Sequence, residues 1–159
     1  MRHPLRLAPQ EYVGRRQYLL TICTHDRQPW FKERSVVEST VSQFLRAADR
    51  CDFDLLAYCF MPDHVHALVG ATTRTADLRH FVRIVKQQSG FAFKRTYRQT
   101  LWQRSYHDRT VRSDEKLQEI AHYIISNPVR AGLVTTAADY PFWGSQRYSR
   151  AELLEFAGR

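Results

Sequence analysis

Apolar and polar residues alternate along four short stretches of the chain, a pattern typical of strands with one buried face. These stretches are also rich in β-branched and aromatic residues, as strands usually are. They cover about residues 17–24, 53–60, 64–70 and 106–112. In the third stretch Val65, Ala67 and Val69 share one face, because successive side chains of a strand point to opposite sides. We expect this face to lie in the core.

Three longer stretches carry apolar residues at spacings of three and four, which predicts amphipathic helices. They cover about residues 35–50, 75–97 and 113–127. Ser35 and Glu38 have the spacing of a capping box, and Ser113 is a favourable N-cap for the third helix. Pro128 ends that helix, because a proline disfavours helical geometry in the residue before it.

The predicted order of elements is strand, helix, strand, strand, helix, strand, which is the order of the ferredoxin-like, or split βαβ, fold. We therefore expect an α+β protein with a four-stranded antiparallel sheet, helices on one face, and an additional C-terminal helix. The first and third strands would be central. A chain of 159 residues has the size of one domain. We expect a single domain over 1–159, with an irregular basic N-terminal arm over about 1–16.

Positive charge is concentrated in one part of the sequence. The formal net charge is +8, and residues 71–112 hold ten Lys or Arg and two acidic residues, whereas the rest of the chain holds fourteen of each. Such a balance favours a polyanionic partner, above all nucleic acid. Arg79, Arg83 and Lys86 form a stripe on the second predicted helix, which is either a DNA-binding surface or a solvated face. The residues expected to bind DNA are Arg79, Arg83, Lys86, Lys94, Arg95 and Arg104.

The cysteines and the N-terminus indicate the compartment. Cys23, Cys51 and Cys59 are odd in number and form no Cys-x-x-Cys motif, which argues against a disulfide framework and a zinc–thiolate site. Residues 1–10 lack the apolar core of a signal peptide, and no apolar run approaches the ~20 residues that span a membrane. We expect a cytoplasmic protein without a membrane partner.

His64 and His66 lie two residues apart in the third predicted strand, so their side chains point to the same face. Two neutral imidazoles on one face of a strand can share a metal ion. The alternative is a pair of ordinary histidines on a half-buried strand. A hard divalent ion such as Mg²⁺ or Mn²⁺ prefers oxygen ligands and tolerates imidazole, so the pair leaves room for an oxygen ligand from elsewhere in the chain.

The third predicted helix carries Tyr123 and, one turn later, Asn127, and residues four apart share a helix face. The amide oxygen of Asn127 could complete a metal site with the histidines and leave positions open for phosphate oxygens. The hydroxyl of Tyr123 could then attack phosphorus. It would need help from the metal, because a free tyrosine has a pKa of about 10 and stays protonated at neutral pH. The alternatives are a tyrosine at the rim of the core and an ordinary residue at a helix end.

Three stretches resemble the REP-associated tyrosine transposases of bacteria, which are single-tyrosine, IS200-like transposases with an HUH motif. The first, which resembles the HUH motif itself, is Met61-Pro62-Asp63-His64-Val65-His66-Ala67-Leu68-Val69. The other two are Trp102-Gln103-Arg104-Ser105-Tyr106-His107-Asp108-Arg109 and Tyr123-Ile124-Ile125-Ser126-Asn127-Pro128-Val129-Arg130-Ala131-Gly132-Leu133-Val134. Their order and spacing agree with the family over residues 12–148.

The resemblance implies a single-strand DNA endonuclease and strand transferase that acts on repetitive extragenic palindromes, which fold as imperfect hairpins. It implies that His64 and His66 bind a divalent metal, that Asn127 is the third ligand, and that Tyr123 is the nucleophile. Attack by Tyr123 would leave a 5′-phosphotyrosine and a free 3′-hydroxyl. Insertion-sequence relatives often carry Gln at the position of Asn127. The implied setting is the bacterial nucleoid, and we expect a monomer.

Two other functions compete with this one. RRM modules share the fold and bind nucleic acid by stacking bases on sheet aromatics, although here the third strand carries histidines in that place. A metal-dependent nuclease could use water as its nucleophile, with Tyr123 in a merely structural role. His107 and His122 are candidates for a general base.

Overall fold

One antiparallel sheet forms the centre of the computed structural model, which describes residues 6–156. Its strands are ordered β4-β1-β3-β2-β5, and β3 is therefore central. They are β1 (Gln17–Cys23), β2 (Phe53–Met61), β3 (His64–Ala71), β4 (His107–Thr110) and β5 (Trp143–Gly144). The ferredoxin-like order of the first four strands is confirmed. The expected number of four strands is wrong, because the two-residue β5 pairs with the outer edge of β2.

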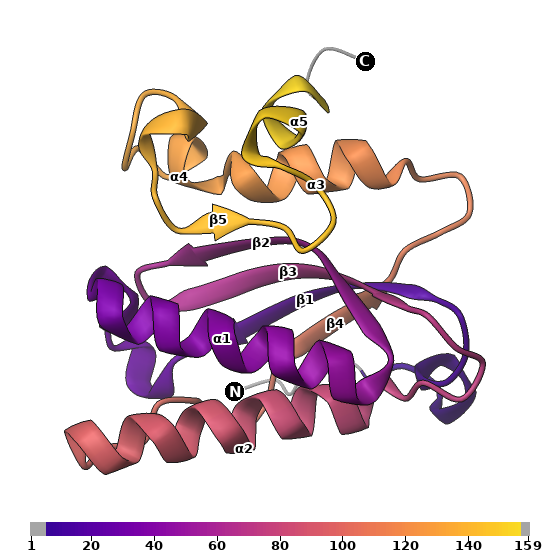
Figure 1. The fold of residues 1–159 in the computed structure, drawn as a ribbon, viewed down its shortest axis with the longest axis horizontal. Coiled ribbons are helices and arrows are strands. Elements are labelled where there is room, and N and C mark those ends of the chain that lie inside the picture. Colours follow the sequence, from indigo (N-terminus) through magenta and orange to yellow (C-terminus); the bar gives the residue numbers. More distant parts are fainter. Residues whose placement is uncertain (1–5, 157–159) are drawn as a thin grey trace.

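Helices cover both faces of the sheet (Figure 1). On one face lie α1 (Arg34–Cys51) and α2 (Leu78–Tyr97). The opposite side holds α3 (Leu117–Ile125), α4 (Asn127–Arg130) and α5 (Arg150–Glu155). Short 3-10 helices are η1 (Pro9–Tyr12), η2 (His25–Arg27), η3 (Trp30–Lys32) and η4 (Ala137–Asp139). Within residues 6–156, no helix combines the length and the apolar character needed to cross a lipid bilayer.

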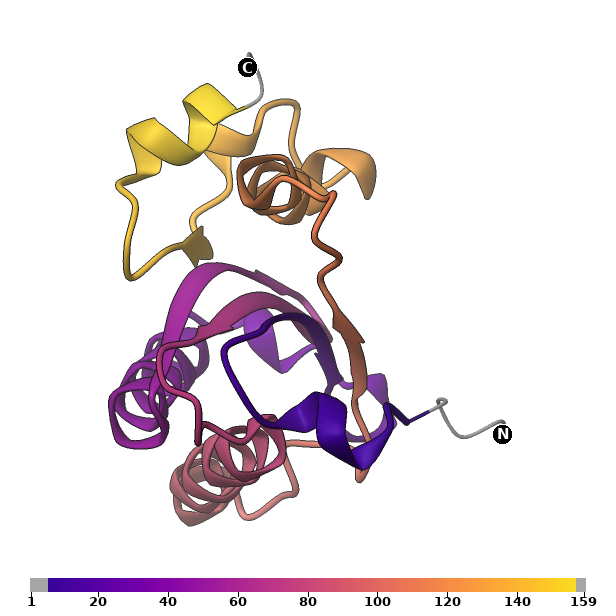
Figure 2. The same ribbon diagram turned by 90° about the vertical axis from the view of Figure 1, so that its right-hand side faces the viewer.

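Each face of the sheet has its own apolar core. Val65, Ala67 and Val69 are fully buried in the core beneath α1 and α2, as the alternation of the third strand predicted. On the other face Leu68 packs with residues of α3, among them Ile124. Figure 2 shows these two helical layers on opposite sides of the sheet. The central strand is thus covered on both faces, and its two histidines occupy positions on the α3 side.

The starts of two helices differ from the prediction. α1 begins after Glu33, whose side chain caps no backbone N–H, so the predicted Ser35 capping box is wrong. α3 begins at Leu117, later than Ser113, because the carboxylate of Glu115 stabilises a turn in front of it. One of its oxygens accepts the backbone N–H of Arg112 at 2.9 Å and lies 2.7 Å from the guanidinium of Arg109.

All three thiols are free and buried within the described residues. Cys59 lies under α3 in the second core, and burial raises the pKa of its thiol to about 12. A buried neutral thiol behaves as a small apolar side chain. Cys59 therefore packs as an apolar residue of this core.

Replacing Gly144 with alanine should destabilise the junction between β2 and β5. A Cβ atom there would lie 2.7 Å from Oη and 3.1 Å from Cζ of Tyr58, and such overpacking costs about 1–3 kcal/mol. Chemical denaturation should show this loss for Gly144→Ala and a partial recovery in the double variant with Tyr58→Phe.

Gly90→Ala is the matched control for that substitution. Gly90 lies inside α2, and an added Cβ would meet only Cδ1 of Trp102, at 3.7 Å. Alanine in a helix interior is favoured over glycine by about 0.5–1 kcal/mol, so this variant should be more stable than wild type. Equal destabilisation by both alanines would mean that Tyr58 does not crowd Gly144.

Candidate active site

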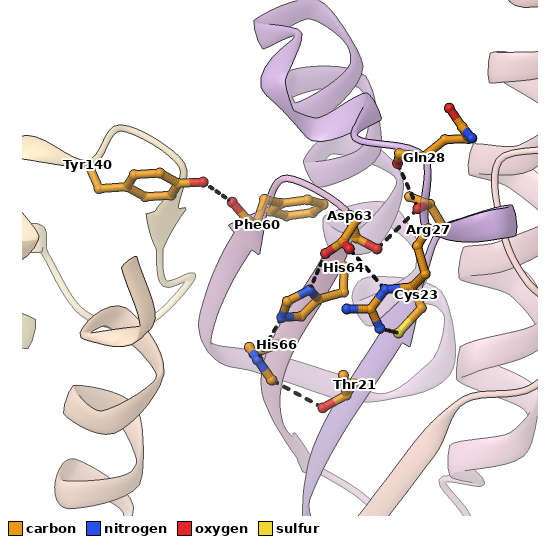
Figure 3. Close-up of polar contacts among 10 residues, drawn as sticks. Thr21, Cys23, Arg27, Gln28, Phe60, Asp63, His64, His66 and Tyr140 are labelled. Atoms are coloured by element: carbon orange, nitrogen blue, oxygen red, sulfur yellow. Dashed lines mark hydrogen bonds and ion pairs between the residues drawn. The ribbon is translucent and has the colours of Figure 1, made fainter. Parts of the chain in front are cut away.

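Two imidazole rings converge on the α3 side of the sheet. Nε2 of His64 and Nε2 of His66 are 3.1 Å apart, and the two rings are nearly perpendicular. Figure 3 shows the two side chains pointing toward one another. An octahedral divalent ion with ligand distances of about 2.1 Å holds adjacent ligand atoms about 3.0 Å apart. The separation therefore fits two neighbouring ligands of one ion.

The outer nitrogen of each ring has its own partner. Nδ1 of His64 lies 2.7 Å from Oδ1 of Asp63, and Nδ1 of His66 lies 3.1 Å from Oγ1 of Thr21. Histidines that bind metals usually hold a carboxylate or other acceptor at the second nitrogen, which fixes the tautomer. Because the Asp63 carboxylate can only accept, His64 donates from Nδ1 and keeps a lone pair on Nε2.

His66 is a neutral base near neutral pH. Burial, the neighbouring His64, and the charges of Arg130 and Arg27, in that order, lower the pKa of His66 to about 4. A neutral imidazole is the form that binds metal ions. Nε2 of His66 either donates to Nε2 of His64 or, when the proton is on Nδ1 and faces Thr21, directs its lone pair into the same space. The chemistry of the donor pair therefore fits a divalent ion.

A metal ion bound by the two histidines would take a third protein ligand from another residue type. Within residues 6–156 there is no group of three His, Cys, Asp or Glu side chains that could hold a metal ion. Asn127 is the first residue of α4 and is separated from the end of α3 by Ser126. Its Oδ1 accepts a hydrogen bond of 2.7 Å from Arg130. An amide oxygen has two lone pairs, so Asn127 can keep this bond and still bind a cation.

Tyr123 lies at the surface of α3, with 57% of its area exposed. It is therefore not a tyrosine of the core rim. Cζ of Arg130 lies 3.6 Å from the centre of its ring, and the same guanidinium donates to the carbonyl oxygen of Tyr123 at 2.8 Å. Arg130 thus holds Tyr123 and Asn127 together at the junction of α3 and α4.

The two halves of the predicted site share one side of the sheet without touching. α3 packs on β2 and β3, and the charge of Arg130 acts on His66. Among the hydrogen bonds of the described residues, none joins Tyr123 or Asn127 to His64 or His66. The link between the histidine pair and the Tyr123–Asn127 pair is therefore Arg130, which contacts Tyr123 and Asn127 and acts on His66 through its charge.

The register of the sheet separates the two candidate general bases. His107 on β4 is paired with Thr21, and Thr21 is paired with His66. Directly opposed residues of antiparallel strands share a face, so His107 lies on the face of the histidine pair. His122 instead lies on α3, where its Nε2 is 3.1 Å from Oγ of Ser126.

Sequence analysis missed one residue next to the histidines. Nε of Arg27 donates to Oδ2 of Asp63 at 2.9 Å, and Nη1 lies 2.9 Å from Sγ of Cys23. The feature of the sequence that could have identified Arg27 is its position just after β1. The last residue of β1, Cys23, pairs with His64, so any turn that follows β1 must lie beside the start of β3.

The basic stripe on α2 lines a groove on the other side of the sheet. A cavity of about 490 Å³ is bounded there by Arg6, Tyr12, Arg79, Val82, Arg83, Lys86, Gln87, Arg104 and Tyr106. A second cavity of about 370 Å³ shares Lys86, Gln87 and Arg104 and adds Lys94. Together these two cavities form what we call the α2 groove. Arg95 lies over the ring of the exposed Phe91.

The cations of the α2 groove are not equivalent. Nζ of Lys86 donates to the carbonyl oxygens of Gln103 and Arg104 at 2.8 and 2.9 Å, and burial and the charge of Arg6 lower its pKa to about 8. Arg79 pairs with Asp77 at 2.9 Å. Among the hydrogen bonds within residues 6–156, the Arg83 guanidinium has one partner, His80, at 3.0 Å, and the Arg104 guanidinium has none, so Arg83 and Arg104 carry the charges that are most available to a ligand.

Comparison with known proteins assigns a family. Residues 12–127 match the family described as "Transposase IS200 like". A Haemophilus influenzae protein named as a REP-associated tyrosine transposase is 26% identical over 149 residues, which cover 86% of this chain and 83% of that protein. A REP-associated tyrosine transposase of Escherichia coli is 28% identical over 115 residues, covering 69% of this chain and 67% of that one.

Two solved structures have folds similar to that of this chain. A REP-associated tyrosine transposase bound to a REP hairpin matches with a TM-score of 0.74 and 19% identity, over 90% of this chain and 82% of the other. This similarity shows that the fold is shared. A Deinococcus radiodurans protein described as a transposase matches with a TM-score of 0.55 and 26% identity, over 76% of this chain and 95% of the other.

Arg130→Gln should raise the pKa of His66 above its value of about 4. A positive charge near an imidazole disfavours its protonation, so removing the charge makes protonation easier. The pKa can be measured by NMR titration of the ring protons in the metal-free protein. Arg98→Gln, on the opposite side of the sheet at the end of α2, is the control and should leave it unchanged. An unaltered pKa in Arg130→Gln would place α4 away from the histidine pair.

Proposed function

The chain belongs to the IS200-like transposase family, and on this premise we propose that it cleaves and rejoins single-stranded DNA through a covalent tyrosine intermediate. Its substrate would be DNA of repetitive extragenic palindromes folded into hairpins, the ligand seen with the structural relative. One observation carries the proposal. The exposed Tyr123 and two converging histidine nitrogens lie on the same side of the sheet, and Arg130, which contacts Tyr123 and Asn127, also acts on His66 through its charge.

In this proposal His64, His66 and the amide oxygen of Asn127 hold a divalent cation, Mg²⁺ or Mn²⁺. Such a cation, when bound, supplies a positive charge beside the phosphate oxygens and stabilises the negative charge that develops there. The protein's own part is preorganisation. Asp63 and Thr21 fix the imidazoles, and the hydrogen bond from Arg130 to Asn127 fixes the amide.

The chemical step is an exchange of two P–O bonds. Oη of Tyr123 forms a bond to the phosphorus while the bond to the 3′-oxygen breaks, which leaves a 5′-phosphotyrosine and a free 3′-hydroxyl. The phenol proton is lost and the 3′-oxygen gains one, so charge and atoms balance. His107 lies on the face of the histidine pair and is the better placed of the two candidate bases. Strand transfer is the same exchange with another 3′-hydroxyl.

The α3 layer supports this function over an RRM-like one. RRM modules bind bases on an open sheet face. Here α3 covers that face, and Cys59, Leu68 and Trp143 of the sheet are buried in one core with residues of α3. The proposed groups all come from one chain, because α3 packs on its own sheet, so we propose a monomer. Its DNA substrate would place it in the bacterial cytoplasm, at the nucleoid.

Tyr123→Phe should abolish both DNA cleavage and the covalent adduct. The substitution removes one exposed hydroxyl and keeps the ring under Arg130, so the fold and Mn²⁺ binding should persist. Tyr106→Phe and Tyr97→Phe are the matched controls and should still form the adduct. Denaturing gels of a labelled hairpin oligonucleotide with the four proteins measure the outcome. An adduct with Tyr123→Phe would assign the nucleophile to another residue, and cleavage without any adduct would assign it to water.

The α2 groove should contribute most of the affinity for DNA. Replacing Arg83 and Arg104 with Gln should weaken binding to single-stranded hairpins of any sequence. It should also reduce the dependence of log K on log salt by roughly 0.7 for each phosphate that the variant no longer neutralises. Fluorescence anisotropy at several salt concentrations measures both quantities.

Arg98→Gln is the control for the α2 groove, because Arg98 is an exposed cation at the C-terminal cap of α2 and lines neither cavity. Its salt dependence should match that of wild type. An equal reduction in Arg98→Gln would indicate diffuse attraction by net charge, without a preferred groove.

A further inference from the structure

The turn that follows β1 has an unusual backbone. Asp26 and Arg27 are adjacent and both adopt left-handed geometry, with φ of 51° and 54°. The other two non-glycine residues with positive φ among residues 6–156, Asp52 and Arg98, cap the C-terminal ends of α1 and α2. Left-handed geometry is common at helix ends. Away from a helix end, and for an arginine, it is strained.

Hydrogen bonds of the buried Thr24 hold this turn against the start of β3. Thr24 is fully buried, and its hydroxyl lies 2.7 Å from the carbonyl oxygen of Gln28 and 3.1 Å from that of Asp63. The backbone N–H of Thr24 also donates to the Asp63 carbonyl oxygen at 2.9 Å, and that of Arg27 donates to Thr24 at 3.1 Å. The turn and the β2–β3 connection are therefore one rigid unit.

The strained turn places the guanidinium of Arg27 beside Asp63, which in turn contacts His64. Figure 3 shows the guanidinium of Arg27 between Cys23 and Asp63, with the Asp63 carboxylate between Arg27 and His64. Oδ2 of Asp63 accepts from Nε of Arg27 at 2.9 Å, and Oδ1 lies 2.7 Å from Nδ1 of His64. Each oxygen of this carboxylate thus has one partner, and the carboxylate cannot rotate without breaking both interactions.

Stability alone does not account for this arrangement. The side chain of Arg27 is 56% exposed, and exposed ion pairs contribute little to folding. The same turn would be less strained with glycine at position 27. What arginine provides is a fixed fork of donors that sets the orientation of a carboxylate.

We propose that Arg27 is a positioning residue for the histidine pair. It fixes Asp63, whose other oxygen keeps the proton of His64 on Nδ1. The lone pair of Nε2 then stays directed at the space shared with His66. This inference rests on the proposed metal site and assigns its outer shell to the turn after β1.

The test compares Arg27→Gly with Asp26→Gly. Both variants relieve the same left-handed backbone, but only the first removes the guanidinium. Three quantities are measured without DNA: the Kd of Mn²⁺ by calorimetry, the protonated nitrogen of His64 by ¹⁵N NMR of the metal-free protein, and the midpoint of thermal unfolding. Removal of an outer-shell partner weakens metal binding by about 10–100-fold in other sites.

For Arg27→Gly we expect Mn²⁺ binding at least about tenfold weaker, a His64 ring protonated on either nitrogen, and an unfolding midpoint equal to or above that of wild type. Asp26→Gly should have an unfolding midpoint equal to or above that of wild type. Its Mn²⁺ affinity and the protonated nitrogen of its His64 should be those of wild type. A structural role alone would move stability and metal affinity in the same direction. Should Arg27→Gly fail to fold, Arg27→Gln keeps the backbone and removes the charge.

Wild-type Mn²⁺ affinity together with an unchanged Nδ1–H in Arg27→Gly or Arg27→Gln would overturn the inference. Failure of the proposed function is a different result. If the wild-type protein binds no Mn²⁺, the proposed metal site is wrong. The position of the His64 proton in the metal-free variants still decides whether Arg27 acts through Asp63.

Discussion

The antiparallel register between β1 and β3 is the constraint on which the structure depends. It pairs Thr21 with His66 and Cys23 with His64. A slip of one residue would turn every side chain of β3 to the other face. Val65, Ala67 and Val69 would then leave the core, and the histidines would enter it. Because both faces of β3 are covered, burial specifies this register strongly, and the position of the histidine pair follows from packing.

The same register brings the outer partners of the histidines into place. Thr21 reaches His66 from the neighbouring strand, and His107 extends the row to β4. Arg27 follows β1 directly and meets Asp63 at the start of β3. Packing of the sheet thus determines which residues form hydrogen bonds with His64 and His66. Tyr123 on α3 is held by fewer contacts than the histidines, because it is exposed and Arg130 is its main contact.

The sequence could predict those features that depend on residues close together in the chain, and it missed those that depend on distant residues. The alternation of Val65, Ala67 and Val69 is a local signal and predicted the buried face correctly. β5 has two residues and no alternation, and it exists only because the edge of β2 offers partners. The predicted start of α3 was wrong because Glu115 binds the long side chain of Arg109 and forms part of a turn before the helix. Arg27 could be found only from the pairing of β1 with β3, which joins residues about forty positions apart.

The distribution of charge over the two faces constrains how a DNA substrate could bind. The α2 groove and the histidine pair lie on opposite sides of the sheet, so one strand that uses both must pass around an edge. On the β5 side, the edge of β2 is already occupied by β5. At the other edge, Tyr106 borders the α2 groove and is followed directly by β4, where His107 is exposed on the face of the histidine pair. β4 is therefore the shorter route between the two surfaces. Its four residues also make it a short and charged edge, which disfavours pairing with another sheet.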